Sequence, residues 1–261
     1  MHPFLNIAVV AARKAGQIIT RSFDNHDKFH VSEKSANDFV TDIDKQCEEV
    51  IIQDILKAYP EHAILAEESG ATGTNGIVWI IDPLDGTSNY IHSVPHVAVS
   101  IAVKVSGCIE HGVVYDPFRD ELFSASRGRG AFCNQKRLRI QRKTGLKDAF
   151  IGTGFPFRNK ELTPQFMQSF AAIFPIVSDI RRSGSAALDL AYVAAGRLDG
   201  FWEWALGPWD IAPGSLMIRE AGGMICDIDG SENYLQSGNV VAGNSKLLKE
   251  MLQLLNEKVA I

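Results

Sequence analysis

The sequence has no apolar run of the roughly 18 residues that a membrane-spanning helix needs. Its apolar N-terminus is interrupted by Arg13 and Lys14 and lacks the layout of a signal peptide. The apolar residues of this stretch recur at helical spacing instead, which predicts an amphipathic surface helix over residues 4–23. We therefore expect a cytoplasmic protein with no membrane partner.

Cysteine is scarce, and no Cys-x-x-Cys pair is present. The four cysteines are scattered along the chain, at Cys47, Cys108, Cys133 and Cys226. This pattern suggests neither a zinc site nor a disulfide framework, and it fits a reducing compartment. Repeats, low-complexity tracts and linkers rich in proline or serine are also missing.

Composition and length are those of an ordinary globular protein. The chain has 261 residues, of which 46% are hydrophobic and 22% charged. This length suffices for one large domain or two small domains with a substantial core. The net charge of −5 argues against nucleic acid as the main partner.

One segment departs from this acidic balance. Residues 127–147 contain no acid and eight basic residues, namely Arg127, Arg129, Lys136, Arg137, Arg139, Arg142, Lys143 and Lys147. A solvated hairpin face is the favoured interpretation. The alternative is a docking patch for RNA or an acidic partner.

Hydrophobic periodicity divides the chain into two lobes, residues 1–145 and 146–261. The first lobe is predicted to hold two helices followed by closely spaced strands, at 4–23, 42–58, 63–68, 77–82, 96–103, 108–116 and 121–126. Because no helix separates these strands, we expect an antiparallel sheet. In the second lobe helices and strands alternate, with helices near 163–173, 185–196, 210–221 and 245–257 and strands near 149–155, 175–180, 199–204, 224–228 and 239–242.

The stretch WIIDPLDGTSN delivers two acids from a predicted core strand into a turn. Asp82 and Asp85 lie three apart across Pro83, which biases Asp82 towards an extended conformation. A capped turn would explain both acids. Three further segments also place acids at the ends of predicted elements, at Glu67, Asp210 and Asp44. Taken alone, Asp210 is explained as a helix cap and Asp44 by the helix dipole.

If these segments lie close together in the fold, the acids are better explained as a metal site than as separate caps and turns. Two carboxylates about 4 Å apart repel by about 4 kcal/mol at an effective dielectric constant near 20. Protons or cations would then be needed, and an oxygen-only ligand set favours magnesium or manganese. Gly86 allows backbone amides to approach an anion closely, and Thr87 adds a hydroxyl that could orient water.

Five motifs spread in order over residues 38–223 resemble the inositol monophosphatase family: DFVTDID, AEES, DPLDGTSN, RRSGSAALDLAYVAAGRLDG and PWDIAPGSLMIREAGG. The resemblance implies a mixed α/β (α+β) fold, an αβαβα layered sandwich of the inositol monophosphatase and fructose-bisphosphatase type. It also implies a homodimer that hydrolyses phosphate monoesters with Mg²⁺ and is inhibited by lithium. The expected substrate is inositol-1-phosphate.

The same resemblance assigns roles to individual residues. Two or three Mg²⁺ ions per site would be held by Glu67, Asp82, the Leu84 carbonyl, Asp85 and Asp210, with Glu67 also touching a third, weaker ion. Thr87 and Asp44 would orient and activate the attacking water, with Glu67 counted among the catalytic residues. The substrate would contact Leu84, Asp85, Gly86, Thr87, Arg181, Gly184, Ser185, Ala186, Glu203 and Asp210. The family's displacement is in line and forms no covalent phosphoenzyme. Residues 69–76 are expected to form a mobile loop over the metals or an exposed hairpin tip.

Rival functions share the metal residues. Fructose-1,6-bisphosphatase, 3′,5′-bisphosphate nucleotidase and histidinol phosphatase differ in the sugar pocket, where Glu203 favours inositol hydroxyls over a second phosphate. A role of another class is also implied, because bacterial members of the family take part in ribosomal RNA transcription antitermination with Nus factors. The basic segment 127–147 is the candidate surface for such factors or RNA.

Overall fold

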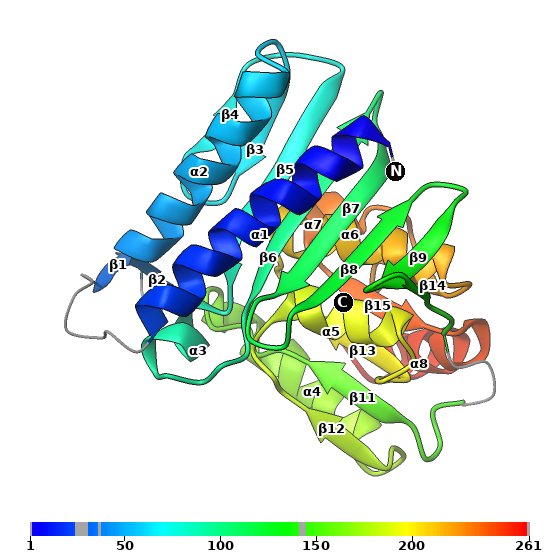
Figure 1. Cartoon of the computed structure of the whole chain (residues 1–261). Coiled ribbons are helices and arrows are strands. Elements are labelled where there is room, and N and C mark those ends of the chain that lie inside the picture. Colours follow the sequence, from blue (N-terminus) through cyan, green and yellow to red (C-terminus); the bar gives the residue numbers. More distant parts are fainter. Residues whose placement is uncertain (1, 24–30, 36–37, 141–144, 260–261) are drawn as a thin grey trace.

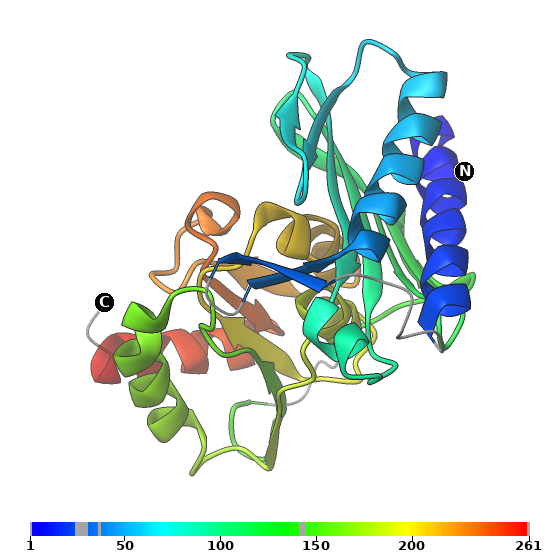
Figure 2. The same ribbon diagram turned by 90° about the vertical axis from the view of Figure 1, so that its left-hand side faces the viewer.

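Five layers of helix and sheet are stacked in the computed structural model (Figure 1, Figure 2). The structure describes residues 2–23, 31–35, 38–140 and 145–259, with side chains for all of these except 31–35 and 38–40. A helix pair, an eight-stranded sheet, a second helix pair, a five-stranded sheet and a third helix pair follow one another. The predicted αβαβα sandwich is therefore confirmed. The helix pairs are α1 (Pro3–Phe23) with α2 (Asp42–Ala58), α5 (Ala186–Ala194) with α6 (Pro208–Glu220), and α4 (Thr163–Ile173) with α8 (Ser245–Lys258).

The eight-stranded sheet has the order β10-β9-β8-β7-β6-β5-β3-β4. Its strands are β3 (Ala63–Ala66), β4 (Gly70–Thr72), β5 (Ile77–Asp85), β6 (Ala98–Val105), β7 (Cys108–Asp116), β8 (Glu121–Ser126), β9 (Gly130–Cys133) and β10 (Lys136–Arg137). The expectation of a wholly antiparallel sheet is wrong at one place, because β3 pairs with β5 in parallel. The short strand β4 folds back on the outer side of β3, so the chain returns to start β5 in the direction of β3.

The five-stranded sheet is mixed, with the order β12-β11-β13-β15-β14. Its strands are β11 (Phe150–Thr153), β12 (Asp179–Arg181), β13 (Gly200–Glu203), β14 (Met224–Cys226) and β15 (Val240–Gly243). β11 runs parallel to β12 and to β13, whereas β15 runs antiparallel to both of its neighbours. The division of the chain at residue 145 stays a prediction.

Smaller elements complete the fold. A hairpin of β1 (Val31–Ser35) and β2 (Asp38–Thr41) leads into α2, and three short helices connect longer elements: α3 (Thr87–Ile91), η2 (Lys160–Leu162) and α7 (Tyr234–Ser237). Among the described helices, none combines the length and apolarity that crossing a bilayer requires.

The N-terminal helix α1 buries one face against the first sheet, as its periodicity predicts. The buried face consists mainly of small residues, among them Ala8, Ala11 and Ala15. Small side chains let the helix approach the strands closely. At Gly16 an added Cβ would lie 2.5 Å from the ring of Tyr115 on β7, so a larger residue would force the two apart.

The central helix α6 is buried against both sheets and contains Pro213. A proline inside a helix cannot donate to the carbonyl four residues earlier. That carbonyl belongs to Trp209, and it accepts a 2.6 Å hydrogen bond from the Ser100 hydroxyl of β6 instead. Sheet and helix are further locked at Gly112 of β7, where a Cβ would lie 2.8 Å from the Pro213 Cα. These contacts fix the start of α6 above the end of β5.

The structure can be compared with two sequence predictions about surface segments, the basic segment 127–147 and the loop 69–76. Residues 127–140 of the basic segment form the turn after β8, strands β9 and β10 and the chain that follows β10, and the five basic residues among them are exposed. Arg142 and Lys143 lie outside the described residues. Within the expected loop at 69–76, residues 70–72 form strand β4, which pairs antiparallel with β3. Because Gly73 lies beside Ala63, residues 73–76 are at the opposite end of β3 from Glu67. In this structure residues 73–76 therefore lie away from Glu67, as in an exposed hairpin tip. Opening and closing of the loop over the metals stays a prediction.

Candidate active site

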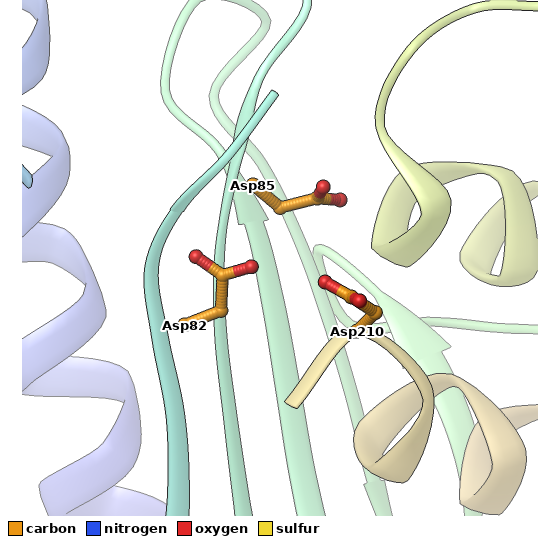
Figure 3. Close-up of side chains that lie close together, drawn as sticks. All are labelled: Asp82, Asp85 and Asp210. Atoms are coloured by element: carbon orange, nitrogen blue, oxygen red, sulfur yellow. The ribbon is translucent and has the colours of Figure 1, made fainter. Parts of the chain in front are cut away.

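Three aspartates converge where β5 ends and α6 begins (Figure 3). Asp82, Asp85 and Asp210 each offer a carboxylate oxygen, and these oxygens all lie within 4.8 Å of one another. Asp82 and Asp210 are only 1% and 4% exposed. The structure therefore brings together three acids that are separated by up to 128 positions in the sequence (210 minus 82).

Strand β5 delivers two of these acids to one place because its pairing is interrupted. The register with β6 shifts between Asp82 and Asp85, where Pro83 has no N–H to donate. The Leu84 amide instead donates a 2.9 Å hydrogen bond to Oδ1 of Asp82. In an uninterrupted strand, residues three apart point to opposite faces. The break allows both carboxylates to face the same cavity.

Each of the other two aspartates is held by the start of a helix. Oδ2 of Asp85 accepts hydrogen bonds from the Ser185 hydroxyl at 2.6 Å and the Ala187 amide at 2.8 Å, both at the beginning of α5. Oδ2 of Asp210 accepts a 2.7 Å hydrogen bond from the Gly207 amide, which caps α6. All three of these hydrogen bonds are accepted by the Oδ2 atoms of Asp85 and Asp210 and do not involve their Oδ1 atoms.

The three carboxylates carry more negative charge than their surroundings offset. Burial, followed by the nearby acids, raises the pKa of Asp82 well above its ordinary value. Burial also raises the pKa of Asp85 to about 6, against the hydrogen bonds from Ser185 and Ala187. For Asp210, burial and the charge of Asp85 raise the pKa to about 7. A bound cation would remove this cost, and a donor set of carboxylate oxygens fits a hard divalent ion.

Glu67 joins this cluster from the end of β3. Because β3 runs parallel to β5, the residue that follows Ala66 lies beside the residue that follows Ile81. The Glu67 amide donates to the Ile81 carbonyl at 3.1 Å, and a side-chain hydrogen bond between Glu67 and Asp82 contributes to the raised pKa of Asp82. Nη2 of Arg158 contacts Oε1 of Glu67 at 2.9 Å.

Thr87 and Asp44 form a hydrogen-bonded pair at the edge of the cluster. The Thr87 hydroxyl lies 2.9 Å from Oδ1 of Asp44 and 3.2 Å from the Leu84 carbonyl. Oδ2 of Asp44 accepts from the Thr41 amide and hydroxyl, at 2.8 and 2.5 Å, in the capping box that starts α2. Burial raises the pKa of Asp44 in spite of these bonds. Asp44 thus has one oxygen committed to the helix cap and the other to Thr87.

The turn between β5 and α3 needs a glycine. Gly86 has φ of 101°, a left-handed conformation that side chains disfavour. An added Cβ would also lie 3.1 Å from the His96 carbonyl oxygen and 3.2 Å from that of Gly184. The close approach of Gly184 links this turn to the segment that begins α5.

On the far side of the cavity, Glu203 ends strand β13. Burial, then the charges of Asp210, Asp189 and Asp85, raise the pKa of Glu203 well above its ordinary value, and Arg182 opposes the shift. Gly154 packs directly against it, since a Cβ at this position would lie 1.9 Å from Oε1 of Glu203. The absence of a side chain at position 154 is what makes room for the carboxyl group.

These groups surround one cavity of about 140 Å³. The predicted site residues that line it are Glu67, Asp82, Leu84, Asp85, Gly86, Thr87, Gly184, Ser185, Ala186, Glu203 and Asp210. Asp44 reaches the cavity through Thr87.

Arg181, which was predicted to contact substrate, is not among the residues that line the cavity. Its guanidinium pairs with Asp179 at 2.5 Å and lies 4.8 Å from the ring centroid of Phe150. Arg182, the first residue after strand β12, lines the cavity instead. The sequence pattern marked this pair of arginines but did not show which of the two lines the cavity.

The segment 153–159 is the part of the cavity that the sequence did not predict. Phe155, Phe157 and Arg158 line the cavity together with Asp189. The guanidinium of Arg182 lies 5.5 Å and 4.8 Å from the ring centroids of Phe155 and Phe157. The exposed aromatic residues in GFPFRN, next to a predicted strand end, are the only local signal that could have marked this segment.

The layered fold and the acidic cavity are those of a metal-dependent phosphatase type of protein, and the comparison with protein families agrees. The model described as "Inositol monophosphatase family" matches residues 1–260, so the chain belongs to this family. Three individual proteins to which the chain is similar illustrate this membership. The chain is 51% identical over 262 residues to the Nus factor SuhB of Escherichia coli strain K12, covering 100% of this chain and 98% of that protein.

Two solved structures share the fold over nearly their whole length. The extragenic suppressor protein suhB of Bartonella henselae has a TM-score of 0.94 at 41% identity, with 98% of this chain and 99% of that chain covered. SaIMPase-II, solved with inositol monophosphate bound, has a TM-score of 0.83 at 28% identity, covering 97% of this chain and 94% of that chain.

Proposed function

We propose that this protein is a Mg²⁺-dependent phosphate monoester hydrolase that converts inositol-1-phosphate to inositol and phosphate. The observation that carries the proposal is the convergence of Asp82, Asp85 and Asp210 in a buried cluster next to the Thr87–Asp44 pair. Membership of the inositol monophosphatase family supports it, as does the likeness to SaIMPase-II, which was solved with inositol monophosphate bound.

The acids would hold two or three Mg²⁺ ions. Glu67, Asp82 and the Leu84 carbonyl would bind one ion, and Asp82, Asp85 and Asp210 would bind another. Support comes from the buried, oxygen-only donor set and from the raised pKa values of its carboxyls, which a divalent ion would lower. When bound, magnesium would supply the Lewis-acid chemistry that activates water and stabilises charge on the leaving oxygen.

Thr87 and Asp44 would handle the attacking water. The Thr87 hydroxyl is tied to Oδ1 of Asp44, so a water that donates to the hydroxyl oxygen would be oriented in the cavity. Its proton would pass through the hydroxyl to Asp44. Burial raises the pKa of Asp44, which makes it a better proton acceptor than an exposed aspartate.

The remaining cavity residues would bind the ester. The backbone amides of Gly86 and Thr87 would hold the phosphate, and Gly184, Ser185 and Ala186 would line the sugar site. Glu203 would bind inositol hydroxyls from the opposite wall. Arg182 replaces Arg181 in this proposal, because of these two neighbouring arginines Arg182 is the one that lines the cavity.

Glu203 also separates this substrate from its rivals. A second phosphate, as in fructose-1,6-bisphosphate or a 3′,5′-bisphosphate nucleotide, would meet a wall carrying both Glu203 and Asp189. We therefore rank these two esters and histidinol phosphate below inositol-1-phosphate. A profile of phosphate release across the four substrates tests the ranking.

The decisive experiment measures phosphate release from inositol-1-phosphate with and without Mg²⁺, for the wild type and Asp85→Asn. Turnover that needs Mg²⁺ and is lost in the variant supports both the metal cluster and the reaction. Equal turnover in both proteins would mean that Asp85 is not an essential ligand and that the site is wrong. The same proposal includes three further expectations: the protein is inhibited by lithium, forms a homodimer and acts in the cytoplasm.

A second function is proposed because the E. coli relative is named a Nus factor. This chain would join a transcription antitermination complex through the basic hairpin, where Arg137 and Arg139 are exposed. Reversal of both residues to Glu should abolish capture of transcription factors or RNA by the purified protein while leaving phosphatase activity intact. Undiminished capture would remove this surface from the proposal.

A further inference from the structure

Arg158 brings a positive charge from the second half of the chain onto a predicted metal ligand. It lies in the loop between β11 and η2, and its Nη2 donates a 2.9 Å hydrogen bond to Oε1 of Glu67, 91 positions earlier. The Glu67 side chain is 9% exposed, whereas that of Arg158 is 47% exposed. The guanidinium thus reaches in from the solvent side and covers one oxygen of a nearly buried carboxylate.

Arg158 also interacts electrostatically with two of the three aspartates of the cluster. It lowers the pKa of Asp85 and of Asp210, in each case against the larger effect of burial. Among the described residues that line the cavity, Arg158 and Arg182 are the two with a fixed positive charge. Arg182 lies against the rings of Phe155 and Phe157, so Arg158 is the arginine that engages the metal-binding end.

An ion and a guanidinium compete for the same carboxylate oxygen. Magnesium binds oxygen at about 2.1 Å. An ion on Oε1 of Glu67 would therefore lie within roughly 5 Å of Nη2 of Arg158, and the two positive charges would repel strongly at such a distance. A side chain attached to the protein has a high effective concentration, which favours it over a weakly held ion from solution.

We propose that Arg158 replaces the third, weakly bound metal ion on Glu67, so that this protein works with two ions per site. Arg158 is then a positioning residue. It neutralises the outer oxygen of Glu67 and leaves the rest of that carboxylate to the ion shared with Asp82. The inference rests on the metal centre of the proposed function, and of the two or three ions that the family resemblance implies it selects two.

The test counts ions bound by the full-length protein, with Mn²⁺ as the probe. Equilibrium dialysis followed by metal analysis, at free Mn²⁺ up to the millimolar range, should give two ions per chain for the wild type and three for Arg158→Met. The matched control is Arg182→Met, which removes the same charge from the same cavity without freeing Glu67 and should still bind two. Arg158→Lys keeps a charge that can reach Glu67 and should also bind two.

A functional readout separates this role from a merely structural one. Turnover of Arg158→Met should fall about tenfold at low Mg²⁺ and recover when Mg²⁺ is raised, because the added ion restores the charge on Glu67. A protein that has lost its fold would not be rescued by magnesium.

Three results would overturn the inference: three ions in the wild type, two ions in Arg158→Met, or a third ion in Arg182→Met as well. The count does not depend on substrate. Two ions in the wild type and three in Arg158→Met would uphold the inference even if inositol-1-phosphate is not hydrolysed. Absence of bound ions in the wild type would remove the metal centre and this inference together.

Discussion

The Thr87 hydroxyl lies 2.9 Å from Oδ1 of Asp44, and the other oxygen of Asp44 closes the capping box of α2. The Asp44 carboxylate therefore connects the N-terminus of helix α2 to the turn that follows strand β5. The arrangement fixes the Asp44 rotamer at both oxygens, which keeps its proton-accepting atom directed at a single hydroxyl. A substitution of Thr87 removes its hydrogen bond to Asp44 and leaves the capping box of α2 intact. Loss of the proton acceptor's partner can therefore be measured separately from loss of the helix cap.

Replacement of Thr87 by Val should lower kcat by about 10²–10⁴, the usual contribution of a positioned proton-transfer group. Valine keeps the shape of threonine but cannot relay a proton to Asp44. Thr87→Ser retains the hydroxyl and should keep most of the activity. Steady-state phosphate release measures both, and the affinity for Mg²⁺ should stay within a few-fold of the wild type. A valine variant with undiminished kcat would remove Thr87 from the mechanism.

Removal of a buried charge should stabilise the metal-free protein. Burial and Asp85 raise the pKa of Asp210 to about 7 in the fold, from 3.8 in the unfolded chain. The folded state therefore binds more protons than the unfolded state between these values, and stability is lost as the pH rises through about 7. In the metal chelator EDTA, Asp210→Asn should melt at a higher temperature than the wild type at pH 8, with a smaller gap at pH 5.

The control for this comparison is Asp148→Asn, an exposed aspartate away from the cavity whose exchange should leave the melting temperature unchanged at both pH values. Saturating Mg²⁺ should reverse the order, because the wild type gains more from the ion than Asp210→Asn does. If the difference in melting temperature between the wild type and Asp210→Asn does not change with pH in EDTA, the charge of Asp210 does not destabilise the metal-free fold.

The sequence predicted the elements well because hydrophobic periodicity is a local property. Strands β7 and β8 and helix α4 have the expected boundaries, and Glu67 follows the end of β3 as the pattern indicated. The strand expected at 77–82 continues through the interrupted pairing to Asp85, so Asp82 lies inside β5. The parallel pairing of β3 with β5 was missed, since a three-residue edge strand such as β4 leaves almost no pattern. Pairing direction depends on contacts between distant segments rather than on local composition.

The same limit explains what was missed at the site. Four of the five motifs contain the acids of the site, because chemistry restricts the residues that can hold a metal. The cavity wall at Phe155, Phe157 and Arg158 has no such signature, since many apolar or basic residues could serve there. Arg181 and Arg182 are adjacent and alike, so the sequence pattern does not show which of the two lines the cavity.

Gly154→Ala should impair substrate binding through Glu203. A Cβ at position 154 would occupy the space of the Glu203 carboxyl group, so that side chain must move away. A buried polar group that loses its hydrogen-bond partner costs about 1–3 kcal/mol, which corresponds to a rise in KM of roughly 5- to 150-fold. Glu203→Gln should raise KM for inositol-1-phosphate in the same direction. Neither change should greatly affect p-nitrophenyl phosphate, which lacks the sugar hydroxyls, and an equal loss for both substrates would contradict a role in sugar recognition.

Gly112→Ala tests how the sheet positions α6. The added Cβ would lie 2.8 Å from the Pro213 Cα and 3.2 Å from its carbonyl oxygen, and backbone atoms cannot yield as the end of a flexible side chain can. We expect a loss of about 1–3 kcal/mol in the free energy of unfolding, measured by denaturant titration. Because α6 carries Asp210, the same displacement should weaken Mg²⁺ binding. Gly76→Ala is the matched control, since no atom lies within 4 Å of its added Cβ. Equal stability of the two variants would show that the contact between β7 and α6 can relax, and the position of Asp210 would then need another support.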